Sequence, residues 1–191
     1  MSETILKTVY FDEPGQSNTG RTLEIVQERA NELDISTILV ASTRGDTGAR
    51  AAAMFQGRSV VVVSHSTGFV ERNAQQLSDE NRAAIEAAGG TILTCQHALG
   101  GVNRAVRKKL GTYLTDEIIA YTLRLFGQGT KVCAEIALMA ADAGLVAVGD
   151  PCIAIGGTGR GADTAMVLVP ANAQEFFDLR VMEILAKPRL P

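Results

Sequence analysis

Residues 37–55 read TILVASTRGDTGARAAAMF, and this stretch decides the fold class. Thr37–Ala41 is predicted as a strand that is apolar on both faces, which is typical of a parallel strand covered by helices on both sides. Gly48–Gln56 is predicted as a helix that ends at Gly57. The seven residues between the two contain three hydroxyls, two glycines and an arginine. The strand and helix indicate an α/β protein, and the composition of the loop between them is typical of a ligand-binding loop.

Strands and helices alternate on both sides of this stretch. SVVVVS, at Ser59–Ser64, is the clearest buried strand, and Ser78 is expected to cap a helix that stops at Gly89. The alternation predicts an α/β fold in three layers, with helices on both faces of a mostly parallel central sheet. Strands are expected at residues 8–11, 37–41, 59–64 and 91–95, and helices at 19–33, 48–56 and 78–88.

The pattern changes after residue 95. Three helices follow without a strand between them: one over residues 102–110, one capped by Thr115, and one with an apolar face from Val132 to Ala143. CIAIGGTGRGADTAMVLVPA, at 152–171, predicts two strands around a glycine-rich loop, and residues 176–186 fit either a strand or a helix. Because no linker or repeat interrupts the pattern, residues 1–191 are expected to form one domain.

Composition narrows the class of protein. The chain has 191 residues and a formal net charge of -3, which argues against a general nucleic-acid binder. No signal peptide or membrane-spanning stretch is expected, and three cysteines without CxxC spacing suit a reducing cytoplasm. Two histidines give little support for a metal site. The densest basic cluster is expected to be a solvated helix face: Arg104, Arg107, Lys108 and Lys109.

The loop Ser42–Gly48 is a candidate phosphate site. It leads into a helix N-terminus, where unpaired N–H groups and the helix dipole favour an anion. Its hydroxyls and Arg44 could add donors, whereas the Asp46 carboxylate has to point away from the anion. The alternative is a plain connection whose Ser and Thr residues only cap the helix. The loop lacks the Gly-Lys-Ser/Thr of a nucleoside triphosphate site.

Two more loops are expected at the same edge of the sheet, because ligands of open α/β sheets bind at the carboxyl ends of strands. GGTGRGAD, at Gly156–Asp163, formally matches the dinucleotide fingerprint, but a strand rather than a helix follows, so a hairpin loop that aims Arg160 at a ligand is the better interpretation. A glycine-rich turn without a ligand is the alternative. SHSTGF, at Ser64–Phe69, offers His65, and Phe69 could stack on a planar ring or close the core.

Cys133, in KVCAEI, is the candidate reactive thiol. A position near a helix start lowers a thiol pKa. The alternative is a buried, inert cysteine, since free cysteines are often buried. The neighbouring apolar residues favour this second interpretation.

Five motifs together resemble a known family: TVYFDEPGQSNT, VASTRGDTG, SHSTGF, KVCAEIALMAADAG and GGTGRGADTA. The chain is similar, from about Thr8 to Pro188, to a group of small prokaryotic proteins that resemble the C-terminal α/β domain of pyruvate kinase. The resemblance implies a three-layer α/β fold and bound flavin mononucleotide (FMN). It does not imply pyruvate kinase activity, because this domain leaves no room in 191 residues for the catalytic barrel.

Carried onto this sequence, the resemblance implies phosphate contacts in the first loop and a ring system across the other two. Arg160 is expected near the N1–C2=O edge of the ring, and Asp163 or a backbone carbonyl is expected to accept from its N3–H. The residues expected to bind the cofactor are Ser42, Thr43, Gly45, Asp46, Thr47, Gly48, His65, Thr67, Gly68, Phe69, Gly156, Gly157, Arg160, Gly161, Asp163 and Thr164.

Two functions of other classes stay open. One is a non-enzymatic sensor of a phosphorylated metabolite, like the regulatory domain of pyruvate kinase, and the other is a thiol-dependent enzyme that uses Cys133. In each case a small molecule, rather than nucleic acid or a membrane, is the expected partner. A homo-oligomer also stays open.

Overall fold

The computed structural model describes residues 3–189 and contains one seven-stranded sheet in the order β1-β7-β6-β5-β2-β3-β4. All neighbouring pairs are parallel except those of β6, which is antiparallel to both β5 and β7. The sheet is therefore mostly parallel, as the sequence predicts. The strands are β1 (Val9–Phe11), β2 (Thr37–Ala41), β3 (Ser59–Ser64), β4 (Thr91–Thr94), β5 (Cys152–Gly156), β6 (Thr164–Val169) and β7 (Arg180–Pro188).

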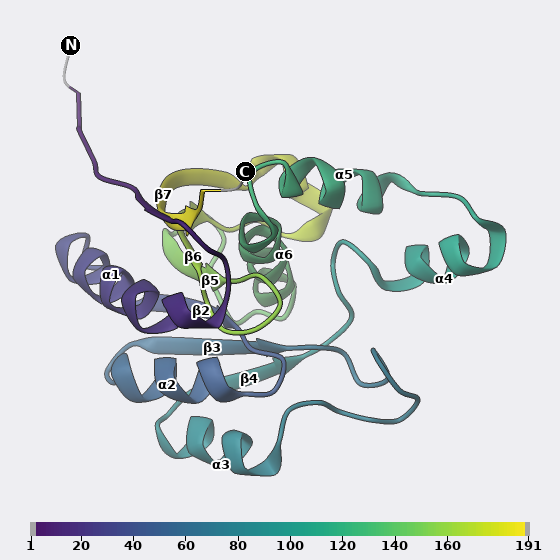
Figure 1. Ribbon diagram of the computed structural model, residues 1–191, viewed down its shortest axis with the longest axis horizontal. Helices are drawn as coiled ribbons and strands as arrows, with labels where there is room; N and C mark the ends of the chain where they lie inside the picture. Colours follow the sequence, from purple (N-terminus) through teal and green to yellow (C-terminus); the bar gives the residue numbers. More distant parts are fainter. Residues whose placement is uncertain (1–2, 190–191) are drawn as a thin grey trace.

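Helices cover both faces of this sheet (Figure 1). Three of them bury their apolar side chains in the core on one face, and α6 packs on the other face through Cys133, Ile136 and Ala140. This arrangement gives the three layers that the alternation predicts. The helices are α1 (Thr19–Glu32), α2 (Asp46–Met54), α3 (Asp79–Ala87), α4 (Gly101–Leu110), α5 (Thr115–Arg124) and α6 (Gln128–Asp142).

The central strands are buried on both faces. Ile38, Leu39 and Val40 of β2 are inaccessible to solvent, with alternate residues in the two core clusters. A strand whose side chains are apolar on both faces requires helices on both sides of the sheet. The bounds of β2 and β3 are those that the sequence predicts.

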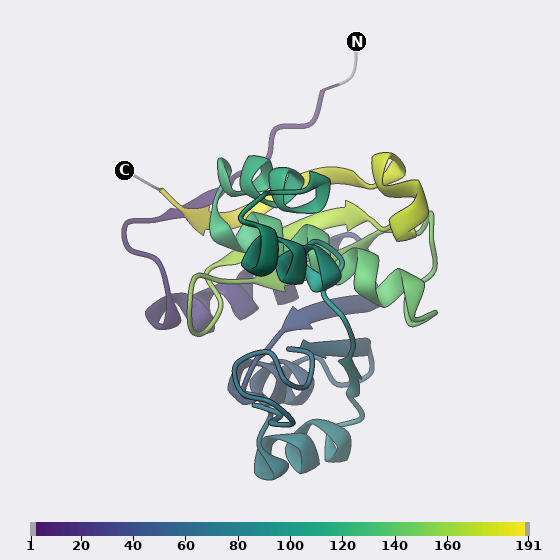
Figure 2. The same cartoon turned by 90° about the vertical axis from the view of Figure 1, so that its right-hand side faces the viewer.

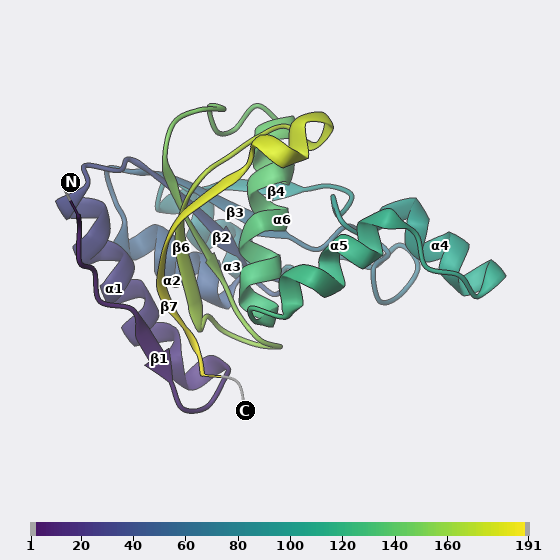
Figure 3. The same ribbon diagram turned by 90° about the horizontal axis from the view of Figure 1, so that it is seen from above.

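The pair α4 and α5 extends away from the sheet. Figures 1 and 3 show it reaching past the end of α6, and in Figure 2 it lies in front of the sheet. No residue of α4 is buried, whereas α5 packs on α6 through Ala120 and Leu138. The start of α4 lies at the edge of the cavity described below, because Arg104 lines it.

Two expectations about element bounds need correction, and one open alternative is resolved. Helix α2 begins at Asp46 rather than Gly48, because Gly45 adopts the left-handed conformation that starts the turn. Thr115 is the first residue of α5 and its side chain makes no capping bond. The ambiguous segment after residue 172 contains both elements, a 3₁₀-helix over Ala173–Asp178 and then β7. Ser78 caps α3 as predicted, since its hydroxyl accepts from the Asn81 N–H.

The two strands around the glycine-rich loop, β5 and β6, form the antiparallel hairpin that the sequence predicts. A strand therefore follows this loop, which removes the dinucleotide fingerprint. Within residues 3–189, no helix is long and apolar enough to cross a membrane.

Candidate functional site

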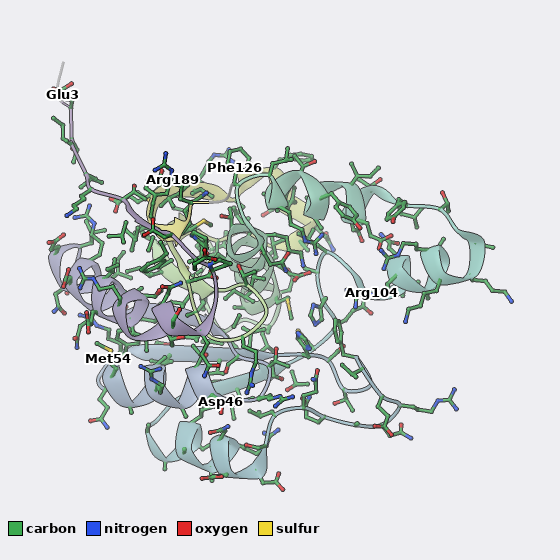
Figure 4. All side chains as sticks on the ribbon, viewed as in Figure 1. Glu3, Asp46, Met54, Arg104, Phe126 and Arg189 are labelled. Carbon is green, nitrogen blue, oxygen red and sulfur yellow. The ribbon has the colours of Figure 1, made fainter. Side chains whose placement is uncertain are left out.

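A cavity of about 470 Å³ opens at the carboxyl ends of β5, β2 and β3. These strands are parallel neighbours, so the loops that follow them meet at one edge of the sheet. The first turns of α6 form another wall, and Figure 4 marks Asp46 at the start of α2 and Arg104 on α4 near the cavity. The three loops that the sequence singles out therefore line one site.

The loop between β2 and α2 presents free backbone donors. Within the described residues, the N–H groups of residues 43–47 have no hydrogen-bond acceptor, whereas the next N–H, of Gly48, donates to Ser42 Oγ at 3.0 Å. Gly45 makes the turn possible, because it has a φ of +100° and a Cβ there would lie 2.4 Å from the Cβ of Asn81. Consecutive N–H groups at a helix start favour an anion.

Asp46 lies at this helix start but is oriented toward α3. Its Oδ1 lies 3.5 Å from Asn81 Nδ2, and Asn81 also donates to the carbonyl of Arg44 at 3.0 Å. Asn81 thus draws the carboxylate toward the side of the loop. Asp46 nevertheless lines the cavity, so the expectation that its charge points away from an anion stays a prediction.

The glycine-rich loop is held from behind by Asp163. This residue is inaccessible to solvent, and its carboxylate accepts from the N–H groups of Gly15 (2.8 Å) and Thr158 (3.0 Å) and from the Thr164 hydroxyl (2.8 Å). Thr19 Oγ1 also accepts from the Ala162 N–H at 3.0 Å. The loop is therefore anchored to the turn and helix that follow β1, and it exposes Arg160 at the cavity.

Three rings, two from the loop after β3 and one from the segment after β4, meet at the next wall. The ring centroid of Phe69 lies 4.1 Å from that of His65 and 4.9 Å from that of His97, and the guanidinium carbon of Arg104 lies 4.5 Å from it. His65 Nδ1 bonds to Gln76 Oε1 at 2.9 Å, and its Nε2 lies 3.3 Å from Thr43 Oγ1. Burial lowers the pKa of His65, so its ring is neutral at pH 7.

A buried ion pair lies beneath these rings. Lys131 and Glu135, one turn apart on α6, are 5% and 4% exposed and bond directly to each other. Glu135 also accepts from the Leu99 N–H at 3.0 Å, and its Oε2 lies 3.5 Å from His97 Nδ1. Burial would raise the pKa of Glu135, but the His97 bond and the Lys131 charge outweigh it and lower this pKa to about 2.

The cavity is more positive than the chain as a whole. Five basic side chains line it, against the carboxylates of Asp46 and Glu135 alone among the described residues, although the chain carries a net charge of -3. Such a concentration of one sign in a cleft attracts a ligand of the opposite sign. The basic residues are Arg44, Arg104, Arg124, Lys131 and Arg160.

The structure brings nine of the sixteen expected residues to the cavity wall: Ser42, Thr43, Asp46, Thr47, His65, Phe69, Gly157, Arg160 and Gly161. The other seven do not line it: Gly45, Gly48, Thr67, Gly68, Gly156, Asp163 and Thr164.

Three expected roles are corrected by this placement. Asp163 is fully engaged in holding the loop, so its carboxylate is not available to a ring N3–H. Gly48 serves packing, because a Cβ there would lie 2.5 Å from Cγ1 of Val62 on β3. Phe69 is half-buried rather than part of the core.

The sequence missed the contribution of the segment between His97 and Glu135. His97 follows β4, and its place after a parallel strand was a usable signal. Lys131 and Glu135 have the spacing of a helical ion pair, but only the fold shows that they face the cavity. Arg104 was assigned to a solvated helix face, whereas its guanidinium covers Phe69 at the cavity.

Cys133 is a structural residue. It is inaccessible to solvent, its thiol donates to the Ala154 carbonyl at 3.3 Å, and burial raises its pKa well above the ordinary value. The effect of the nearby helix start is outweighed by this burial. A thiol-dependent enzyme that uses Cys133 therefore has no geometric basis here.

The fold and the cavity define an α/β domain with a ligand pocket at the carboxyl edge of its sheet. The family model "Pyruvate kinase, alpha/beta domain" matches residues 21–168, and the chain belongs to this family. The matched region contains the loops after β2, β3 and β5 and all of α6.

Solved structures similar to this chain include two of pyruvate kinase from Cryptosporidium parvum. They share 11% and 12% identity with it, cover 76% and 83% of it, and each has a TM-score of 0.38. O-ureido-L-serine synthase, at 22% identity and a TM-score of 0.31, covers 50% of this chain, which in turn covers 30% of that enzyme. The chain spans 21% and 23% of the length of the two pyruvate kinases.

Proposed function

We propose that the cavity binds FMN, with the phosphate at the loop Ser42–Gly48. The observation that carries this proposal is the run of N–H groups at residues 43–47, which has no acceptor within residues 3–189 and belongs to a loop that lines a cavity with an excess of basic side chains. A phosphate accepts several such bonds at once, and the dipole of α2 adds to the attraction. The Thr47 hydroxyl and the Ser42 hydroxyl hydrogen supply further donors.

The cavity suits the rest of the molecule. A volume of about 470 Å³ is in the usual range for small-molecule sites. His65 and Phe69 line the cavity and offer ring edges or faces to the ring system, and Arg160 is exposed on the glycine-rich loop at the same cavity. With Asp163 engaged, a backbone carbonyl takes the place of acceptor for the ring N3–H. When bound, the flavin supplies hydride or electron transfer, and the protein positions and tunes it.

A second candidate is a sensor of a phosphorylated metabolite. Membership of the family of the pyruvate kinase alpha/beta domain favours it, because the resemblance drawn from the sequence implies a regulatory domain of this kind. The same loop and the same basic side chains would hold the phosphate of that metabolite. The two candidates therefore differ in what lies beyond the phosphate.

Visible absorbance of the purified chain separates the two. FMN binding predicts flavin bands that stay with the protein through gel filtration, or that return when apoprotein is titrated with FMN. A colourless protein that is stabilised against heat by sugar phosphates but not by FMN would overturn the flavin proposal in favour of the sensor.

A further inference from the structure

Arg104, Arg124 and Lys131 line the cavity from α4, α5 and α6. These helices lie toward the face of the sheet that α6 covers, whereas the loop Ser42–Gly48 leads into α2 on the opposite face. We call the three residues the cation wall. The cavity thus has basic groups on a side that the phosphate loop does not occupy.

Two of the three charges of the cation wall, those of Arg104 and Arg124, are not balanced by a carboxylate within residues 3–189. Lys131 is paired with Glu135, whose carboxylate also bonds to Leu99 and lies beside His97. Within residues 3–189, neither arginine has a carboxylate at ion-pair distance: Arg104 lies over Phe69, and Arg124 donates from Nε to Gln128 at 2.7 Å. Each guanidinium has five N–H donors, so most of them remain available.

The charges of Arg104 and Arg124 both act on Lys131, with which they line the cavity. Burial lowers the pKa of Lys131, the pair with Glu135 opposes this, and the charges of Arg124 and Arg104 lower it further. Lys131 is 5% exposed, so water screens this repulsion poorly. By contrast, Lys108 and Lys109, on the same helix as Arg104, are exposed and do not line the cavity.

We propose that the cation wall is a second anion subsite, which takes a carboxylate or phosphate group in addition to the phosphate at the loop Ser42–Gly48. This proposal depends on the proposed function in one respect, which is that the first anion binds at the loop Ser42–Gly48. If FMN occupies that loop, the second anion belongs to a separate anionic substrate, because FMN carries a single phosphate. If the ligand is a metabolite, one molecule with anionic groups at both ends fills both positions.

Inorganic phosphate is the probe that tests the subsite. The full chain, free of ligand and ¹⁵N-labelled, is titrated at constant ionic strength, and NMR follows the backbone N–H signals of residues 43–47 and the Nε–H signals of Arg104 and Arg124. Two groups of signals should respond. Arg104→Gln or Arg124→Gln should raise the dissociation constant at the cation wall about tenfold, because each removes a charge-assisted bond. Signals of residues 43–47 should keep their midpoint within about twofold.

Lys108→Gln is the matched control, since it removes the same charge from α4 without touching the cavity. It should change neither midpoint. The second subsite would be overturned if the Nε–H signals of Arg104 and Arg124 in the wild type did not shift with phosphate. It would also be overturned if both arginine variants left the midpoint at the cation wall unchanged. If the proposed phosphate site at the loop Ser42–Gly48 is wrong, the backbone N–H signals of residues 43–47 will not shift with phosphate, and this result is independent of the cation wall.

A repeat with saturating FMN identifies the source of the second anion. If phosphate still binds at the cation wall, the second anion comes from a separate molecule. If FMN blocks the cation wall itself, its own phosphate lies there, and the assignment of two subsites with FMN at the loop is wrong.

Discussion

The carboxylate of Asp163 accepts a hydrogen bond of 2.8 Å from the backbone N–H of Gly15, which lies 148 residues earlier in the chain. Two further donors, Thr158 and Thr164, complete its coordination. The turn after β1 and the glycine-rich loop are therefore one unit. The shape of the cavity depends on this bond, although neither residue lines it.

Asp163→Asn should destabilise the protein by about 2–4 kcal/mol, because it weakens bonds to a buried charge and places an amide N–H₂ against N–H donors. Urea unfolding measures this loss. Asp150→Asn, an exposed aspartate, is the control and should change stability by less than about 0.5 kcal/mol. A loss below about 1 kcal/mol for Asp163→Asn would show that the loop does not need this anchor.

Glu135 should make stability depend on acid pH. Its pKa is about 2 in the folded chain, against about 4.3 for an ordinary glutamate. Because the folded state binds this proton less readily, the stabilisation is complete above about pH 4.5 and disappears as the pH falls toward 2, an effect of about 2–3 kcal/mol.

The comparison is with Glu135→Gln, which leaves Lys131 buried without its partner and should cost about 3–5 kcal/mol at pH 7. The gap to wild type should narrow as the pH falls from 5 toward 2. Glu71→Gln, an exposed site, should show a constant small gap. A pH-independent gap for Glu135→Gln would contradict the assigned coupling.

Thiol labelling should distinguish the three cysteines. Cys133 and Cys152 are inaccessible, and burial raises the pKa of both, to about 12 for Cys152, whereas Cys95 is half-buried. In the native protein a disulfide reagent should react first at Cys95, and the other two should react only on unfolding. Fast reaction at Cys133, suppressed by a ligand, would revive the thiol enzyme.

Features of the fold can be predicted from the sequence where the residues that determine them are close together in the chain. The bounds of β2 and β3 follow from apolar runs whose side chains are buried on both faces, and the cap of α3 follows from Ser78 alone. The fold class is predictable because such signals alternate in a fixed order. The family match then confirms the part of the resemblance that concerns the pyruvate kinase C-terminal α/β domain.

The site was only half predictable, because its other half comes from packing. Arg104 and Glu135 belong to helices whose local pattern resembles that of any helix, and only the fold brings them to the cavity. Asp163 was placed at the ligand because it lies in the right loop. Its contact with Gly15 is a long-range bond that the sequence pattern does not contain.

Arg160→Ala should leave the fold and FMN binding intact and lower the reduction potential of bound flavin. Arg160 is exposed on the loop at the cavity, and a cation beside the ring stabilises the negative charge that reduction adds. A spectroscopic redox titration against a reference dye measures the shift. An unchanged potential with flavin still bound would remove Arg160 from the ring site.

The phosphate loop is tested most directly by the affinity of apoprotein for FMN and for riboflavin. A phosphate gains charge-assisted hydrogen bonds of about 1.5–3 kcal/mol each and an interaction with the helix end of about 0.3–2 kcal/mol. These contributions overlap, and the cost of desolvating the phosphate opposes them. We therefore expect a net preference of about 2–4 kcal/mol for FMN over riboflavin. This preference corresponds to about 30- to 1000-fold in affinity.

The decisive measurement is a titration of wild type, Thr47→Glu and Thr91→Glu with both flavins. Thr47 is 6% exposed and lines the cavity at the start of α2, so a glutamate there should place a carboxylate where the phosphate binds. Thr91 is exposed at the far end of β4 and gives the same chemical change away from the site. We expect the preference for FMN to be lost in Thr47→Glu and kept in Thr91→Glu. Equal affinity of the wild type for FMN and riboflavin would contradict a phosphate at the loop Ser42–Gly48.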